Sequence, residues 1–281
     1  MLFNFKYRIV KLIETIPLLQ IFIYNNLEKF NFLFPHDKDY NGIKLLFHKN
    51  EKRDFLDISA NIGLSTIGFR EMGFKLNNIH LFEPDNFLIK AYLNKIKKKY
   101  SNIFIHKFGL SNISEKKFLY RAYYKGKFFH FNNSFDKQYI LAKIKHNYPN
   151  KYQEFKLKKK PFKLKKFENI KIKSKACFVK IDVEGHDHKV IKGMLRFIKK
   201  ETPVILVEYN MSNFDEIYIM LKEYYNCYIF NIDKNNFKKL TNFEIKLLIK
   251  GKIFESTYVK NSVNIFFIKK NFKFLLNIWK K

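Results

Sequence analysis

The chain has 281 residues, of which 47 % are hydrophobic, and it carries 55 lysine or arginine residues against 25 acidic ones. This length and apolar content fit one α/β domain with extensions, and they exclude a chain too polar to form a core. The net charge of +30 raises nucleic acid or an anionic membrane as partners.

The basic residues are nearly all lysine. Arginine, which phosphate and base recognition favours, is rare in this chain. Lysine, asparagine, isoleucine, phenylalanine and tyrosine are over-used together, as an AT-rich genome would produce. We therefore attribute the charge mainly to compositional bias and expect no nucleic-acid partner, with a real anionic partner as the alternative. The arginines are Arg8, Arg53, Arg70, Arg121 and Arg196.

Residues 1–45 are expected to form an N-terminal helical extension. Glu14, Pro17 and Gln20 interrupt its apolar stretch, so no run reaches the roughly 18 apolar residues that a membrane span requires. The first alanine is Ala60, so no small-residue cleavage site follows and secretion is not expected. Apolar residues at helical spacing predict an amphipathic helix that packs on the domain or, as the alternative, rests on a membrane surface: Ile9, Leu12, Ile13, Ile16, Leu19 and Ile23.

The cysteines bear on the compartment. Cys177 and Cys227 each lie in an apolar run with no CxxC spacing, which predicts buried free thiols rather than a disulfide or a zinc site. Free thiols are typical of a reducing compartment. We expect a cytoplasmic location, with a peripheral position at the inner face of the membrane as the alternative.

From Arg53 onward, strand patterns alternate with helical stripes. This alternation predicts a Rossmann-like α/β fold, with a mostly parallel seven-stranded sheet and helices on both faces. Helical stripes occur within residues 64–72, 87–96, 190–198 and 214–225. The expected strands are Asp54–Ser59, Asn78–Glu83, Ile103–Leu110, Cys177–Asp182, Pro203–Tyr209, Cys227–Asp233 and Asn264–Ile268.

The middle of the chain, from Ser111 to Lys175, is less regular. The alternating residues Lys116–Arg121 predict hairpin strands. The lysine-rich stretch around Pro161 could bind phosphate or nucleic acid, but compositional bias favours a solvated lysine-rich hairpin.

A turn of small residues follows the first expected strand, in the sequence FLDISANIG from Phe55 to Gly63. Small residues let a backbone approach a ligand closely, and the next helix begins directly after them. The turn lacks the G-x-G-x-x-G fingerprint, which disfavours NAD. Glu83 ends the second strand about 20 residues later, where an acidic side chain commonly binds ribose hydroxyls. Turn and acid together predict an adenosine-type ligand.

A second acidic signal is VKIDVEGHD, from Val179 to Asp187. Asp182 and Glu184 follow an apolar strand and share one face of an extended backbone. Such a pair could act as a base, orient a hydroxyl or bind a metal. His186 and His188 raise a metal site, but no third ligand is evident, so a solvated turn is favoured and no metal is predicted.

Three segments, FLDISANIG, then FEPD (Phe82–Asp85), then VKIDVEGHDHKVIKG (Val179–Gly193), resemble in this order the FkbM-type methyltransferases, a family of S-adenosylmethionine-dependent O-methyltransferases. The family pattern is D-x-G-A-N-x-G, then F-E-P, then K-x-D-x-E-G-x-E with a later glycine. Ser59 stands where the family usually has glycine, and Asp187 stands in place of glutamate. The resemblance covers about residues 50–270. The matching residues are Asp57, Ala60, Asn61, Gly63, Phe82, Glu83, Pro84, Lys180, Asp182, Glu184, Gly185 and Gly193.

The resemblance implies a class I methyltransferase domain over residues 46–281, with S-adenosyl-L-methionine as the cofactor. It implies O-methylation of a small molecule or of a sugar in a glycan or glycolipid. The alternative is a catalytically inactive module of this fold that binds nucleic acid or anionic membrane through its basic surface. The sequence does not indicate an oligomeric state. The implied catalytic residues are Asp182 and Glu184, and the implied cofactor-binding residues are Asp57, Ser59, Ala60, Asn61, Gly63 and Glu83.

Overall fold

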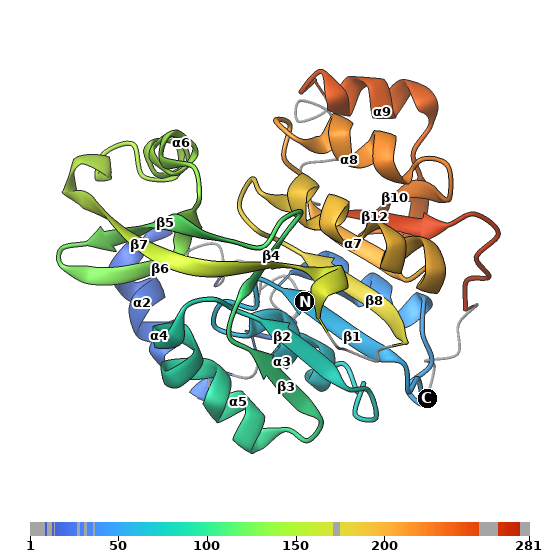
Figure 1. Cartoon of the computed structure of the whole chain (residues 1–281), viewed down its shortest axis with the longest axis horizontal. Helices are drawn as coiled ribbons and strands as arrows, with labels where there is room; N and C mark the ends of the chain where they lie inside the picture. Colours follow the sequence, from blue (N-terminus) through green and yellow to red (C-terminus); the bar gives the residue numbers. More distant parts are fainter. Residues whose placement is uncertain are drawn as a thin grey trace.

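An eight-stranded sheet forms the centre of the computed structural model, which describes residues 9, 13, 15–26, 29, 30, 33–35, 37–170, 175–252 and 264–275 (Figure 1). Its strand order is β11-β10-β12-β9-β8-β1-β2-β3. Strands β3, β2, β1, β8 and β9 are parallel, whereas β12 runs antiparallel to both β9 and β10. The strands are β1 (Asp54–Ile58), β2 (Ile79–Phe82), β3 (Ile103–His106), β8 (Ala176–Ile181), β9 (Val204–Glu208), β10 (Tyr225–Asn231), β11 (Asn236–Lys239) and β12 (Asn264–Lys269).

The predicted α/β class is confirmed, and the predicted strand count is wrong by one in this sheet. The additional strand is β11, which pairs antiparallel with β10 across a short turn. Asn235 takes a positive φ of 47° in that turn, a conformation that asparagine adopts more readily than most residues. The lysine-rich sequence of β11 has too little apolar alternation to indicate a strand.

Helices cover both faces of the large sheet, because alternate strand residues point to opposite sides. Phe55 and Phe178 lie in one core with α3, α4, η4 and α5, and Leu56 and Val179 lie in the other with α7, α8 and α9. The α7 stripe of Val190, Ile191, Met194 and Ile198 is buried as predicted. These helices are α3 (Leu64–Glu71), α4 (Asn86–Leu88), η4 (Ile89–Leu93), α5 (Asn94–Lys99), α7 (Asp187–Glu201), α8 (Phe214–Leu221) and α9 (Asn242–Ile249).

A second sheet of four strands, in the order β4-β7-β5-β6, is inserted between β3 and β8. In Figure 1 it extends to the left, away from the large sheet. The predicted hairpin at Lys116–Arg121 is confirmed, because β5 pairs antiparallel with β6. Its elements are β4 (Gly109–Ser111), β5 (Glu115–Tyr124), β6 (Lys127–Ser134), α6 (Lys137–Asn147), η5 (Tyr152–Glu154), β7 (Phe155–Lys166) and η6 (Phe167–Asn169).

Two predictions in this region are wrong. The expected third strand Ile103–Leu110 is divided: β3 ends at His106, and Gly109 begins β4, which belongs to the second sheet. The lysine-rich stretch does not form a hairpin, since β7 is one long strand that pairs with β5 and, at its last residues, with β4. Residues 171–174 of that stretch lie outside the described residues.

The N-terminal region packs against the core of the large sheet, where Ile23 and Tyr24 are buried, and against the second sheet. Helix α2 (Pro17–Asn25) places Ile21 in a small core with Phe129, Ile140 and other residues of the second sheet and α6. The helix predicted from Ile9 is interrupted at Ile16, and α2 starts at Pro17, a residue suited to a first helical turn. The short helix η3 (Lys38–Leu45) follows. Leu12 lies outside the described residues, and the boundary between residues 1–45 and 46–281 stays a prediction.

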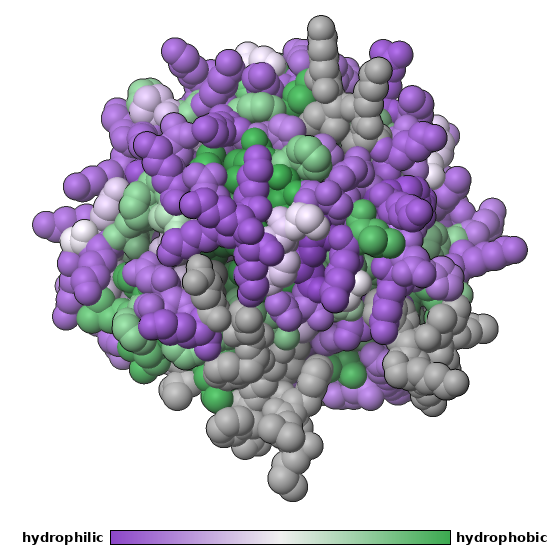
Figure 2. Space-filling model, turned by 90° about the horizontal axis from the view of Figure 1, so that it is seen from below, coloured by the Kyte–Doolittle hydropathy of each residue, from purple (hydrophilic) through white to green (hydrophobic). Residues whose placement is uncertain are grey.

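Both cysteines are buried and free, as predicted. None of the helices in the described ranges is long and apolar enough to cross a bilayer. Figure 2 shows hydrophilic side chains over most of one face of the molecule, with separate hydrophobic groups between them.

Candidate active site

A cleft lies at the carboxyl ends of β1, β2 and β8, where parallel sheets commonly bind ligands. It encloses about 720 Å³ of space between protein atoms, part of it open to solvent. The large sheet contributes strand-end residues, and the second sheet contributes the opposite wall. The lining includes Ser59, Asn61, Glu83, Asp85, Leu119, His130, Asn133, Phe135, Asp182 and Glu184.

The small-residue turn after β1 forms one end of the cleft. Its backbone is fixed by two hydrogen bonds, from the N–H groups of Ser59 and Ala60 to the carbonyl oxygen of Phe82. Ser59 and Asn61 have positive φ angles of 64° and 51°. Glycine adopts such angles without strain, which gives a physical reason for the glycine that the family pattern has at the position of Ser59. Ser59 and Asn61 both line the cleft.

Glu83 connects this turn to the end of β2. Its Oε2 accepts a hydrogen bond from the backbone N–H of Asn61, and its Oε1 accepts one from the backbone N–H of Asp85, each at 2.9 Å. Burial raises the pKa of Glu83 to about 8, and the two N–H donors offset this only in part. Glu83 is therefore a buried carboxyl group that shapes the cleft wall and also faces the cleft.

Three of the predicted cofactor-binding residues lie outside the cleft lining. Asp57 is completely buried, accepts a hydrogen bond from the Thr66 hydroxyl at 2.9 Å and lies 3.7 Å from the Lys180 ammonium. Burial raises the pKa of Asp57, while Lys180 and Thr66 oppose the rise. Ala60 is part of the core, and Gly63 precedes α3 with a φ of 83°. Asp57, Ala60 and Gly63 therefore belong to the backbone and core around the turn and do not line the cleft.

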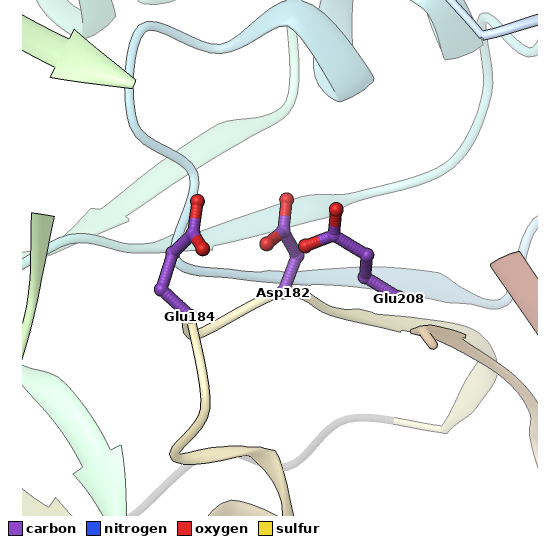
Figure 3. A group of neighbouring side chains, drawn as sticks. All are labelled: Asp182, Glu184 and Glu208. Atoms are coloured by element: carbon purple, nitrogen blue, oxygen red, sulfur yellow. The ribbon is translucent and has the colours of Figure 1, made fainter. Parts of the chain in front are cut away.

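The acidic strand end predicted at Asp182 and Glu184 includes a third acid, Glu208, at the end of β9. One carboxylate oxygen from each of the three lies within 4.8 Å of those of the other two. Figure 3 shows the three carboxylates side by side, extending to the same side of the strand ends. We call Asp182, Glu184 and Glu208 the acidic cluster. Asp182 and Glu208 share a side-chain hydrogen bond, which requires a proton on one of them.

Neighbouring charges distribute protons unequally over the acidic cluster. Burial acts to raise the pKa of Asp182, but the Lys180 ammonium at 3.1 Å and Lys143 outweigh it, so this pKa is lowered. Burial raises the pKa of Glu208 well above its ordinary value, and Lys143 offsets only part of the rise. The neighbouring lysines thus favour the ionised form of Asp182, whereas burial favours the protonated form of Glu208.

The second sheet and α6 contact this cleft at both ends. At one end the Arg121 guanidinium lies 3.1 Å from the Asp85 carboxylate, and the Asn61 side chain donates a hydrogen bond to the carbonyl oxygen of His130 at 3.2 Å. At the other end, the Ser134 hydroxyl donates to the backbone carbonyl of Glu184 at 2.7 Å. We call the second sheet, together with helix α6, the roof of the cleft.

The prediction of a solvated turn at His186 and His188 is wrong for His186. His186 is buried, and its Nε2 lies 2.9 Å from the Ser111 hydroxyl oxygen. Asp187 is also buried and fixes the loop, because its Oδ1 accepts the backbone N–H of Val183 at 2.8 Å and its Oδ2 accepts from Asn213 at 3.2 Å. Neither His186 nor Asp187 lines the cleft.

The sequence did not single out Glu208, Arg121 or Lys143 as site residues. Glu208 ends a strand adjacent to β8, so its place at the same sheet edge as Asp182 follows once the strand order is known. Arg121 and Lys143 belong to the inserted region, and nothing local in the sequence connects them to the cleft.

A sequence model described as the methyltransferase FkbM domain matches residues 57–228. A solved structure of a methyltransferase FkbM from Methylobacillus flagellatus KT is 16 % identical, with a TM-score of 0.44, and the match covers 66 % of this chain and 42 % of that one. The chain therefore spans less than half of that protein. A precorrin-6y C5,15-methyltransferase from Geobacter metallireducens GS-15 is 11 % identical over 82 % of this chain and 84 % of its own, with a TM-score of 0.38.

The plantazolicin methyltransferase BpumL, solved in complex with SAH, is 10 % identical, with 88 % of this chain and 87 % of that chain covered and a TM-score of 0.37. No curated protein sequence matches this chain.

Proposed function

Since this chain belongs to the methyltransferase FkbM family, we propose that it transfers a methyl group from S-adenosylmethionine to a hydroxyl group of a sugar in a glycan or glycolipid. The observation that carries this proposal is one cleft lined both by Ser59, Asn61 and Glu83 and by Asp182 and Glu184, two members of the acidic cluster. Such an arrangement can hold a nucleoside cofactor and an acceptor hydroxyl side by side.

The residues present fit the cofactor. Asn61 Oδ1 is buried and accepts no hydrogen bond from the described part of the chain, so it is available to a ligand donor. Each oxygen of Glu83 accepts one N–H, and a carboxylate oxygen can accept a second donor, such as a ribose hydroxyl. Ser59 and Asn61 would bind the methionine end, and Glu83 would bind the ribose. When bound, S-adenosylmethionine supplies an electrophilic methyl group on a positively charged sulfur.

The acidic cluster would handle the acceptor. Asp182 would accept the hydrogen bond of the acceptor hydroxyl and take its proton as the oxygen becomes methylated. Lys180 keeps Asp182 ionised for this role. A positioned base of this kind contributes roughly 10²- to 10⁴-fold to a rate, and alignment of the oxygen contributes further.

A sugar acceptor agrees with the composition of the cleft. Carboxylates accept hydrogen bonds from sugar hydroxyls, whereas Leu119 and Phe135 offer apolar surface to the carbon-bound hydrogens of a sugar ring. The family resemblance supports the same acceptor class.

Two measurements test the proposal. Calorimetry should detect binding of S-adenosylhomocysteine to the full chain, and labelled S-adenosylmethionine should transfer its methyl group to a member of a panel of glycan and glycolipid acceptors. Absence of cofactor binding would overturn the proposal. A salt-dependent shift of nucleic acid or anionic vesicles in the same preparation would then favour the inactive, basic module.

A further inference from the structure

Lys143 on α6 forms the closest contact between the roof and the acidic cluster. Its Nζ lies 2.7 Å from Oε1 and 2.5 Å from Oε2 of Glu184, so the ammonium binds both oxygens of that carboxylate. The Tyr139 hydroxyl, one helical turn earlier, donates to the same Oε2 at 3.3 Å. Lys143 is 25 % exposed and Glu184 is 17 % exposed, so the pair is largely shielded from water.

Three carboxyl groups this close together need compensation, because each ionised group disfavours ionisation of the others. Lys180 contacts Asp182 at 3.1 Å, and Lys143 contacts Glu184. Glu208 shares a hydrogen bond with Asp182. Each member of the acidic cluster thus has its own partner, and two of the partners are ammonium groups.

Three carboxylates with this spacing can bind a hard divalent cation through oxygen ligands. An ion at this place would have to compete with the Lys143 ammonium, which already occupies both Glu184 oxygens. Two positive groups on one carboxylate repel each other at short range.

We propose that Lys143 is a positioning residue whose ammonium is the built-in cation of the acidic cluster, in the place that a divalent metal ion would otherwise take. It fixes Glu184 against the roof and leaves Asp182, whose side chain is 36 % exposed, as the acid that faces the acceptor. The catalytic part of this inference rests on the proposed function: the hydroxyl proton would pass to Asp182, while Glu184 stays paired with Lys143.

The test uses Mn²⁺ alone as the probe, titrated into the full chain and followed by the electron paramagnetic resonance signal of the free ion. The wild-type protein should bind no Mn²⁺ at the cluster. Lys143→Ala should create a site with a Kd of roughly 10⁻³ M or tighter, the range of weak carboxylate sites. Lys143→Arg keeps the charge and should behave as wild type. Lys145→Ala, on the same helix but without a contact to the acidic cluster, is the matched control.

Three results would overturn the proposal. One is Mn²⁺ binding by the wild-type protein that Asp182→Asn removes. The second is a folded Lys143→Ala protein that gains no site. The third is an equal gain in the Lys145→Ala control. If circular dichroism shows that Lys143→Ala does not fold, Lys143→Gln, which retains most of the stem, provides the same comparison.

Methyl transfer gives a second readout. Lys143→Ala should lower kcat at least about tenfold and leave the cofactor KM within about threefold, because Lys143 contacts the acidic cluster and not the cofactor end. Lys143→Arg should recover part of kcat. A protein that bound no S-adenosylhomocysteine would contradict the proposed function, while the Mn²⁺ titration would still decide the role of Lys143.

Discussion

Glu83 accepts the backbone N–H of Asn61 at 2.9 Å, although the two residues follow different strands. One carboxylate therefore fixes the turn after β1 and presents its remaining lone pairs to the cleft. This contact adds to the two backbone hydrogen bonds from Ser59 and Ala60 to Phe82 that also hold the turn.

Glu83→Ala should raise the Kd of S-adenosylhomocysteine at least tenfold, about 1.4 kcal/mol, because it removes both the proposed ribose acceptor and the support of the turn. Isothermal calorimetry measures this directly. Glu223→Ala, at an exposed glutamate far from the cleft lining, is the control and should bind as wild type. Unchanged affinity in Glu83→Ala would remove Glu83 from the cofactor site.

Cofactor affinity should depend on pH through Glu83. Its pKa of about 8 means that the free protein carries a protonated Glu83 at neutral pH. Hydroxyl donors from a ligand favour the ionised form, so binding releases a proton and affinity rises as pH increases toward 8, by at most about tenfold per pH unit. Above that pH the affinity levels off. Measured Kd values for S-adenosylhomocysteine from pH 6 to 9 that were flat, or that rose with pH, would contradict this.

Asp182→Asn should reduce methyl transfer by roughly 10²- to 10⁴-fold, because the amide cannot take the acceptor proton. Cofactor affinity should stay within a few fold, since the proposed cofactor contacts come from Ser59, Asn61 and Glu83. Labelled-methyl transfer and calorimetry on the same preparations separate the two effects. Asp215→Asn, at an exposed position in the first turn of α8, is the control. Near wild-type transfer in Asp182→Asn and in Glu184→Gln would make the acidic pair structural.

Arg121→Leu should destabilise the fold by about 3–5 kcal/mol, because it leaves the buried Asp85 carboxylate without its counter-ion. The same change removes the guanidinium that lies 4.0 Å from the centre of the Phe128 ring. Asp85→Asn retains the side-chain cap on α4 and removes the charge, so the double variant should regain much of the loss. Thermal unfolding of the single and double variants measures the coupling, and additive losses would argue against the pair.

Gly193→Ala should lower stability by about 1–3 kcal/mol, although alanine is the better helix former. An added Cβ on Gly193 would lie 2.1 Å from the carbonyl oxygen of Ser111, so α7 could not keep its place against β4. Gly68 in α3 is the matched control, because a Cβ there meets Pro35 and Tyr40 at ordinary distances of 3.5 to 3.6 Å. Gly68→Ala should be neutral or stabilising in the same urea titration. A neutral Gly193→Ala would show that α7 can shift.

The sequence predicted the large sheet well because its central strands are buried on both faces and read as continuous apolar runs. The α7 stripe was equally clear. Helix α9 was missed although Thr241 and Glu244 form a capping box, a signal that is visible in the sequence as T-x-x-E before an apolar run. Helix α6 was also missed although Asp136 caps it, because lysines interrupt its apolar stripe.

The roof could not be predicted, because its contacts with the cleft are long-range. Strands β5 and β7 pair with each other, but β6, α6 and η5 separate them along the chain. In addition, β7 carries so many lysines that its alternation is hidden. Lys143 and Arg121 resemble the many other basic residues of the chain until the tertiary structure places them beside Glu184 and Asp85. The cofactor-binding and catalytic assignments stay predictions until the variants above are measured.

The chain enters and leaves the second sheet at neighbouring positions, since Gly109 of β4 pairs with Leu164 of β7. A segment whose ends meet can be replaced as a cassette without moving the strands on either side. Residues 109–166 are thus a natural unit for grafting between proteins of this family. Such a graft would need to preserve the Arg121 guanidinium and the His130 carbonyl, which contact Asp85 and Asn61 of the large domain.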